Sequence, residues 1–220
     1  MKIINVEGIV IKKRNIGEAD LLITLFTKEN GKADIYIYGI RKSNKREKAS
    51  VELMSVSEYV IYEKNSRYVA NSFTIKNYFH KISGNYLKLQ ISYYLLHIID
   101  RIYEYNSEDA DFYDKVIKSF TYINSLKSGE EKKLYYLVLY LLRSIIAEQG
   151  FYGGDLIISE NIGNGRESMR ENAEMLFRKS YKEILSEDVY EVNELTSMII
   201  YLESYINYNL NINLNFKYFV

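Results

Sequence analysis

The chain has 220 residues, of which 47% are hydrophobic and 26% charged, a composition typical of a globular protein with one large domain or two small ones. It contains 29 basic and 29 acidic residues, so its overall charge gives no reason to expect a polyanionic partner. The absence of cysteine excludes disulfides and thiolate metal sites and fits the reducing cytoplasm. The N-terminus lacks a signal-peptide pattern, and the longest apolar run, residues 134–142, is too short to span a bilayer, so we expect a cytoplasmic chain without a membrane segment.

Charge is distributed unevenly along the chain. Residues 1–80 contain 14 basic and 9 acidic side chains, whereas the remainder has an acidic excess. The densest basic segment is residues 39–50, GIRKSNKREKAS, with five cations and one acid. A single cationic loop is most often only solvated, but a basic half of a neutral protein favours a surface that meets a polyanion.

Residues 2–75 have the composition of β-strands. Five short strands in so short a segment are typical of a small closed barrel, most often the OB-fold. We therefore predict an α+β chain of two domains, with a five-stranded OB-fold barrel at residues 1–80. The expected strands are rich in β-branched and aromatic residues and cover residues 2–14, 20–28, 32–40, 51–63 and 67–75, with a turn at 64–66.

The hydrophobic period changes from two to 3.6 after Lys81, which predicts an all-helical domain at residues 81–220. The first helix is apolar on nearly every side and is expected at the centre of a bundle. The predicted helices cover residues 85–105, 107–126, 128–150, 171–185 and 192–209.

Capping residues mark the ends of two of these helices. Ser107 is the expected N-cap of the second helix. Ser128 and Glu131 have the spacing of a capping box at the start of the third helix, and Gly150 is expected to end it.

No pattern in the sequence predicts catalysis. His80 and His97 have no third or fourth ligand nearby, so we expect both to be structural. The acidic pairs all lie in predicted first helical turns, where they interact favourably with the helix dipole. The glycine-containing stretches at residues 150–154 and 163–168 lack the strand, spacing and lysine of a phosphate-binding loop. We expect a binding protein and no enzyme.

The third predicted strand suggests how such a protein binds. In an OB-fold, nucleic acid crosses strands 2 and 3, with cations on phosphates and aromatic rings on bases. By the two-residue period of a strand, Ile35 and Ile37 face the core and Tyr36 and Tyr38 face outward. Ordinary surface tyrosines are the alternative, because the chain contains 23 of them. The candidate nucleic-acid-binding residues are Lys12, Lys13, Arg14, Tyr36, Tyr38, Arg41, Lys42, Lys45, Arg46 and Lys48.

Five short motifs follow one another along the first 42 residues: Gly-Ile-Val-Ile at 8–11, Gly-Glu-Ala-Asp at 17–20, Leu-Phe-Thr at 25–27, Glu-Asn-Gly-Lys at 29–32 and Gly-Ile-Arg-Lys at 39–42. In this order and spacing they resemble the N-terminal domain of the bacterial recombination mediator RecO family. The C-terminal residues 195–220 are similar to the last helix and tail of that family, and the helical middle resembles it in pattern only.

The resemblance implies an OB-fold and a helical domain that act in DNA repair. It implies binding of single- and double-stranded DNA, annealing of complementary strands, and help in loading recombinase onto DNA coated with single-strand-binding protein. The implied partners are RecR and the C-terminal tail of the single-strand-binding protein, in a nucleoid-associated cytoplasmic location. The basic loop matches residue by residue, so we expect it to contact DNA. Two alternatives stay open, an RNA-binding OB-fold protein and a protein-binding scaffold whose basic side docks an acidic partner.

The chain departs from the family pattern at residues 150–170. Many relatives carry a four-cysteine zinc module after a Gly-Phe-x-x-Asp-Leu-like stretch, and this chain has GFYGGDL there without any cysteine. We expect no zinc and no other cofactor. Asn164 and Gly165 predict a tight turn that replaces the metal as the local fold-back.

Overall fold

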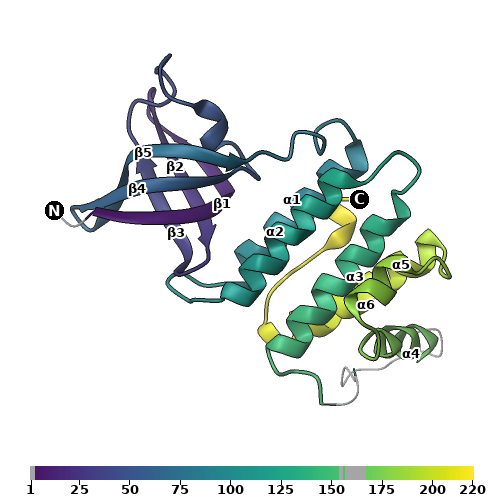
Figure 1. Cartoon of the computed structure of the whole chain (residues 1–220). Coiled ribbons are helices and arrows are strands. Elements are labelled where there is room, and N and C mark those ends of the chain that lie inside the picture. Colours follow the sequence, from purple (N-terminus) through teal and green to yellow (C-terminus); the bar gives the residue numbers. More distant parts are fainter. Residues whose placement is uncertain (1–2, 154–155, 157–166) are drawn as a thin grey trace. The chain divides into compact units, whose positions relative to one another are not determined.

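The computed structural model describes residues 3–153, 156 and 167–220. The first five strands close into a barrel in the order β1-β2-β3-β5-β4, with β4 pairing back onto β1 (Figure 1). All neighbouring strands are antiparallel except β3 and β5, which form a short parallel pair. This is the predicted five-stranded OB-fold barrel. The strands are β1 (Ile3–Ile16), β2 (Asp20–Thr27), β3 (Gly31–Ile37), β4 (Val56–Lys64) and β5 (Arg67–Asn77).

Alternate residues of the strands fill the barrel. Val10, Leu25 and Ile35, from three different strands, are completely buried in one hydrophobic cluster. Burying an aliphatic side chain of this size contributes roughly 1.5–3 kcal/mol, so this cluster stabilises the barrel strongly.

The fourth strand begins later than the predicted residue 51. A short 3-10 helix, η1 (Lys48–Val51), precedes it, and strand pairing starts at Val56. The carbonyl oxygen of Ser50 accepts three hydroxyl hydrogen bonds that hold η1 on the barrel. The donors are Ser55 at 3.1 Å, Ser57 at 3.0 Å and Tyr59 at 2.6 Å.

The hairpin between β4 and β5 turns at Asn65 and Ser66, whose φ angles are 51° and 57°. Positive φ at both central residues is typical of the type I′ turn, which matches the twist of paired strands. This confirms the turn predicted at residues 64–66 and makes Arg67 the first residue of β5.

Packing divides the chain into two compact units. The first contains residues 1–84 and 96–125, and the second contains residues 85–95 and 126–220. The helix α1 (Tyr86–Ile102) contributes residues to both. The boundary predicted between residues 80 and 81 follows the change from strand to helix in the sequence, whereas packing groups residues 96–125 with the barrel.

Residues 96–125 cover part of the outer surface of the barrel. They include α2 (Ala110–Ser125). Phe26 of β2 points away from the barrel core by strand alternation, yet it is 0% exposed. Three aromatic rings cover it: Tyr103 at 5.3 Å, Phe112 at 6.1 Å and Tyr113 at 5.9 Å between ring centres.

The second unit is a helical bundle. Its α3 packs against α5 and α6, and α4 packs against α6, in green to yellow in Figure 1. Among the helices of the described residues, none is long and apolar enough to cross a membrane. The elements are α3 (Lys132–Glu148), α4 (Glu167–Leu176), α5 (Tyr181–Ser186), α6 (Val192–Leu210) and η2 (Phe216–Tyr218).

A buried carboxylate holds the end of the chain in this bundle. Glu203 on α6 is 4% exposed and accepts hydrogen bonds from the Tyr94 hydroxyl at 2.6 Å and the Phe216 backbone N–H at 2.7 Å. Burial raises the pKa of Glu203. The Phe216 ring also lies 5.0 Å from that of Tyr94, so the C-terminal segment is an integral part of the bundle core.

The predicted cap of the second helix is wrong. The carboxylate of Asp109, and not Ser107, accepts the N–H of Phe112 at 2.9 Å. Tyr105 forms a β-bridge to Gly31, which keeps the chain extended beyond α1 and delays the start of α2 to residue 110.

The capping box predicted at Ser128 is also wrong, because α3 begins three residues later than a Ser128 cap requires. The carboxylates of Glu130 and Glu131 accept the backbone N–H groups of Lys127 and Gly129, both at 2.8 Å. These bonds build a tight turn before the helix instead of capping it.

The helix predicted at residues 171–185 is two helices, α4 and α5. Ser180 begins the second one with a capping box, in which its hydroxyl accepts the N–H of Glu183 and its own N–H donates to the Glu183 carboxylate. A serine three residues before a glutamate is the start signal that apolar periodicity alone conceals.

The segment after α3 is irregular where it is described. The helix ends at Glu148, and Gly150 has a φ of 73°, which confirms the predicted helix end. The turn predicted at Asn164 and Gly165 lies outside the described residues.

Candidate nucleic-acid interface

Two tyrosines lie on the outer side of the barrel, Tyr36 within β3 and Tyr38 one residue beyond its end. Ile35 and Ile37 are buried in the barrel core, whereas Tyr38 is 46% exposed and Tyr36 is partly exposed. This confirms the predicted alternation of faces. The two rings lie 6.5 Å apart with 30° between their planes, so they form a continuous aromatic surface.

The strand register places two apolar residues beside Tyr36 and an arginine two strands away. Leu22 lies opposite Tyr36 on β2, and Arg14 lies opposite Leu22 on β1. Val69 lies opposite Tyr36 on β5. Opposed residues project from the same face of a sheet. Leu22 and Val69 are buried and Arg14 is exposed, so this outer surface has an aromatic centre, an apolar floor and a cation two strands away.

Arg67 also lies at this surface, although the sequence did not single it out. Its guanidinium carbon is 5.1 Å from the ring centre of Tyr36, a cation–π contact worth about 0.5–1 kcal/mol at an exposed site. The parallel pairing of β3 with β5 brings it there, and pairing between distant strands is not visible in local sequence patterns. The available signal was the pair of cations, Lys64 and Arg67, that flank the hairpin turn.

The turn between β1 and β2 holds the start of the basic loop. Asp20 accepts the N–H of Gly39 at 2.8 Å, and Gly39 has a φ of 67°, a left-handed conformation that suits glycine. The backbone N–H of Arg41 donates to the carbonyl of Ala19 at 3.0 Å. Its guanidinium donates to the carbonyl of Gly17 at 2.9 Å. The motifs at residues 17–20 and 39–42 therefore contact each other.

Lys42 adds an ion pair to this contact, at 2.8 Å from the carboxylate of Glu18. The Lys42 and Glu18 side chains are 64% and 87% exposed. An exposed pair of this kind is typically worth about 0–1 kcal/mol, so a phosphate can displace the carboxylate at little cost.

Arg46 stabilises the barrel from within the loop. Its guanidinium donates to the carbonyl of Tyr38 at 2.8 Å and lies 4.5 Å from the ring centre of Phe73. The backbone N–H of Arg46 also donates to the hydroxyl of Ser43 at 3.1 Å. Burial lowers the pKa of Arg46. These contacts give Arg46 a structural role that the charge pattern did not predict.

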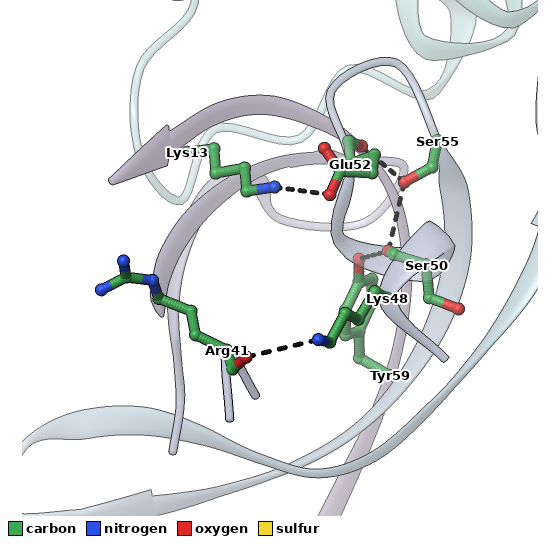
Figure 2. A network of polar contacts seen from close by, with 7 residues as sticks. All are labelled: Lys13, Arg41, Lys48, Ser50, Glu52, Ser55 and Tyr59. Carbon is green, nitrogen blue, oxygen red and sulfur yellow. Dashed lines mark hydrogen bonds and ion pairs between the residues drawn. The ribbon is translucent and has the colours of Figure 1, made fainter. Parts of the chain in front are cut away.

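Lys13 contacts the residue that follows η1, and Lys48, the first residue of η1, contacts the basic loop. Figure 2 shows Lys13 paired with Glu52 at 2.6 Å and Lys48 donating to the carbonyl of Arg41 at 3.3 Å. In the same view the Arg41 guanidinium points away from this network. Lys13 and Lys48 thus help to fix the loop while their side chains stay at the surface.

Lys12 and Lys32 both contact Asp100 near the end of α1. Lys12 is largely exposed and lies 2.7 Å from the Asp100 carboxylate. Lys32 is 7% exposed and donates to the Asp100 backbone carbonyl at 2.7 Å, and burial lowers its pKa. A Cβ on the preceding Gly31 would lie 2.3 Å from the carbonyl oxygen of Ser107. The motif at residues 29–32 therefore joins residues 96–125 to the barrel.

Among the residues that the structure describes, two of the predicted cations have exposed side chains without a polar partner. Arg14 and Lys45 form no ion pair or side-chain hydrogen bond with any residue that the structure describes. Together with Lys42, they are the predicted cations most accessible to a phosphate.

The described residues offer no candidate metal centre. In residues 3–153, 156 and 167–220, no group of three or more His, Cys, Asp or Glu side chains is arranged to hold a metal ion. His80 lies exposed in the loop before α1, and His97 lies partly buried within α1.

Comparison with known proteins links this barrel to DNA repair. Residues 1–79 match the family model described as Recombination protein O N terminal. The chain is 30% identical to the DNA repair protein RecO of Thermoanaerobacter sp. (strain X514) over 51% of this chain and 46% of that protein. It is 29% identical to the DNA repair protein RecO of Caldanaerobacter subterraneus subsp. tengcongensis over 57% of this chain and 51% of that protein.

The matched region spans about half the length of these curated relatives. The family-model match at residues 1–79 contains the barrel, the two motifs that contact each other and the basic loop. The resemblance predicted from those motifs is thereby confirmed. Over residues 1–79 this chain is therefore similar to the N-terminal domain of the RecO family.

Proposed function

We propose that this protein is a recombination mediator in DNA repair that holds DNA phosphates on the outer face of β1, β2 and β3. The observation that carries the proposal is the accessible cations Arg14, Lys42 and Lys45 around the Tyr36–Tyr38 surface of a RecO-family barrel. The other predicted cations form contacts within the protein that hold the loop and the strands beside this surface.

The mechanism requires no catalysis and no cofactor. Lysine and arginine neutralise phosphates and release condensed counterions, so binding is independent of sequence and falls steeply with salt. Neutralising two strands at one surface removes their repulsion and brings complementary bases together, which promotes annealing. Both single- and double-stranded DNA present the phosphates that such a site needs. RecR and the C-terminal tail of single-strand-binding protein are the partners that we propose for recombinase loading.

The experiment compares two triple variants with the same charge change. Arg14→Ala, Lys42→Ala and Lys45→Ala together remove the accessible cations. Binding of a single-stranded oligonucleotide is measured by fluorescence anisotropy over a range of salt. Each lost phosphate contact lowers the salt slope by about 0.7 log units, so we expect weaker binding and a slope reduced by roughly 2.

The matched control replaces three other exposed lysines, Lys81, Lys118 and Lys127, by alanine. We expect nearly normal affinity and slope from this control. Equal losses in the two variants indicate an effect of net charge alone, and an unchanged slope in the first variant refutes the phosphate site.

Two alternative functions give different results with the unaltered protein. An RNA-binding protein prefers RNA in competition with DNA of equal length, because the 2′-hydroxyl distinguishes the two. A protein-binding scaffold shows no mobility shift with either at low salt. Annealing of strands coated with the cognate single-strand-binding protein, with and without RecR, tests the mediator role directly.

A further inference from the structure

We propose that Arg67, Tyr36 and Tyr38 form a base-stacking platform that selects unpaired DNA over duplex. The inference rests on the proposed DNA site and adds to it the class of strand that the site prefers. Arg67 is the new element, since neither the charge pattern nor the family motifs single it out.

The first step is the geometry of the rings. The Tyr36 and Tyr38 rings lie 6.5 Å apart and 30° from parallel, and the Arg67 guanidinium lies 5.1 Å from the Tyr36 ring centre. Tyr36 therefore has a second ring and a guanidinium as neighbours. Bases stack on aromatic rings and on guanidinium planes, and every base offers a flat face for this.

The second step is that the platform is supported by the barrel. Tyr36 belongs to β3 and Arg67 to β5, and the pairing of Ile35 with Tyr68 and of Tyr36 with Val69 fixes their relative position. Arg46 donates to the carbonyl of Tyr38 at 2.8 Å, which anchors the residue just beyond the end of β3. Rings held by rigid elements bind with less loss of freedom than rings on a loose loop.

The third step concerns the charge around the platform. Arg67 forms no ion pair with any residue in the described part of the chain, and it is exposed at the start of β5. Arg14 lies two strands from Tyr36 on the same face, Lys45 lies in the basic loop that follows Tyr38, and the proposed phosphate contacts are theirs. A strand lying over them can place one or two unpaired bases on the rings. In a duplex the flat faces of the bases are already stacked on each other, so only the phosphate contacts remain.

Binding to three DNA ligands of equal length distinguishes contacts with bases from contacts with phosphates. The ligands are a single strand, a duplex, and a base-free strand with the same phosphates. We expect the unaltered protein to bind the normal single strand roughly 5- to 150-fold more tightly than the base-free strand, as one stacked base implies. Tyr38→Leu and Arg67→Ala should remove most of this difference and leave duplex binding within about twofold.

Arg67→Lys distinguishes a platform from a simple cation, because lysine keeps the charge but has no planar group. We expect this variant to bind the duplex and the base-free strand normally while its preference for normal single strands falls. The control is Lys64→Ala on the other side of the same turn, which should keep the preference. Urea unfolding of each variant verifies that the barrel is intact.

The outcomes separate this inference from the proposed function. Equal binding of normal and base-free strands, with a normal salt slope, refutes the platform and leaves the phosphate site standing. An Arg67→Lys variant with an unaltered preference assigns Arg67 to phosphate contact and refutes its stacking role. Failure to bind any of the three ligands refutes the proposed function itself.

Discussion

The two ends of the outer surface of β2 and β3 differ in exposure although both carry aromatic and basic residues. At the end containing Phe26 and Lys32, residues 96–125 cover the strands and both side chains are buried. At the end containing Tyr36 and Tyr38, the rings remain at the surface with exposed cations around them. An aromatic ring beside a cation therefore indicates a binding surface only where no other segment of the chain packs over it.

The covered end should contribute most to stability. Phe26→Ala removes a completely buried ring that contacts three others, and such substitutions typically cost about 3–5 kcal/mol. Urea unfolding of the first unit should show this loss. The matched change at the open end, Tyr38→Ala, should cost less than about 1 kcal/mol, since Tyr38 is 46% exposed. Similar losses in the free energy of unfolding for Phe26→Ala and Tyr38→Ala would contradict the difference between the covered and the open end.

Arg46 tests whether the open end contains structural cations as well as accessible ones. Arg46→Ala removes a hydrogen bond to Tyr38 and a cation–π contact with Phe73, so we expect the free energy of unfolding to fall by about 1–2 kcal/mol. The neighbouring Lys45→Ala should change it by less than about 0.5 kcal/mol. If the two variants were equally stable, Arg46 would belong with the accessible cations.

Tyr113 gives the smallest expected effect and a distinct pH dependence. Its hydroxyl donates to Glu7 at 3.3 Å at the covered end, and burial raises its pKa above the usual 10.0. Its stabilising effect is therefore complete below pH 10 and is lost as the pH rises further, because the unfolded chain ionises first.

Tyr113→Phe should cost about 0.5–1.5 kcal/mol at neutral pH and should weaken the loss of stability between roughly pH 10 and 11. Denaturant midpoints at pH 8, 10 and 11 measure both effects. An identical pH dependence in the variant and the unaltered protein would show that the tyrosine is not shielded by the covering segment.

Local patterns in the sequence predicted the positions of the barrel strands well. The two-residue alternation in β3 places Ile35 and Ile37 inside and Tyr36 and Tyr38 outside, because burial of the aliphatic set fixes which face is which. Helix starts were predicted less well. Ser107 and Ser128 had suitable spacings, but Asp109 and the turn before Lys132 determine where α2 and α3 begin.

The sequence also identified the barrel family and a basic surface beside two tyrosines, because strand period, charge and short motifs are all local properties. Only the tertiary structure separated the cations of that surface into structural and accessible ones. Arg46 packs on Phe73, Arg41 binds the turn at Gly17, and Lys45 is left to solvent, since these partners lie far apart in sequence. The same holds for Arg67, which reaches Tyr36 only because β5 pairs with β3 when the barrel closes.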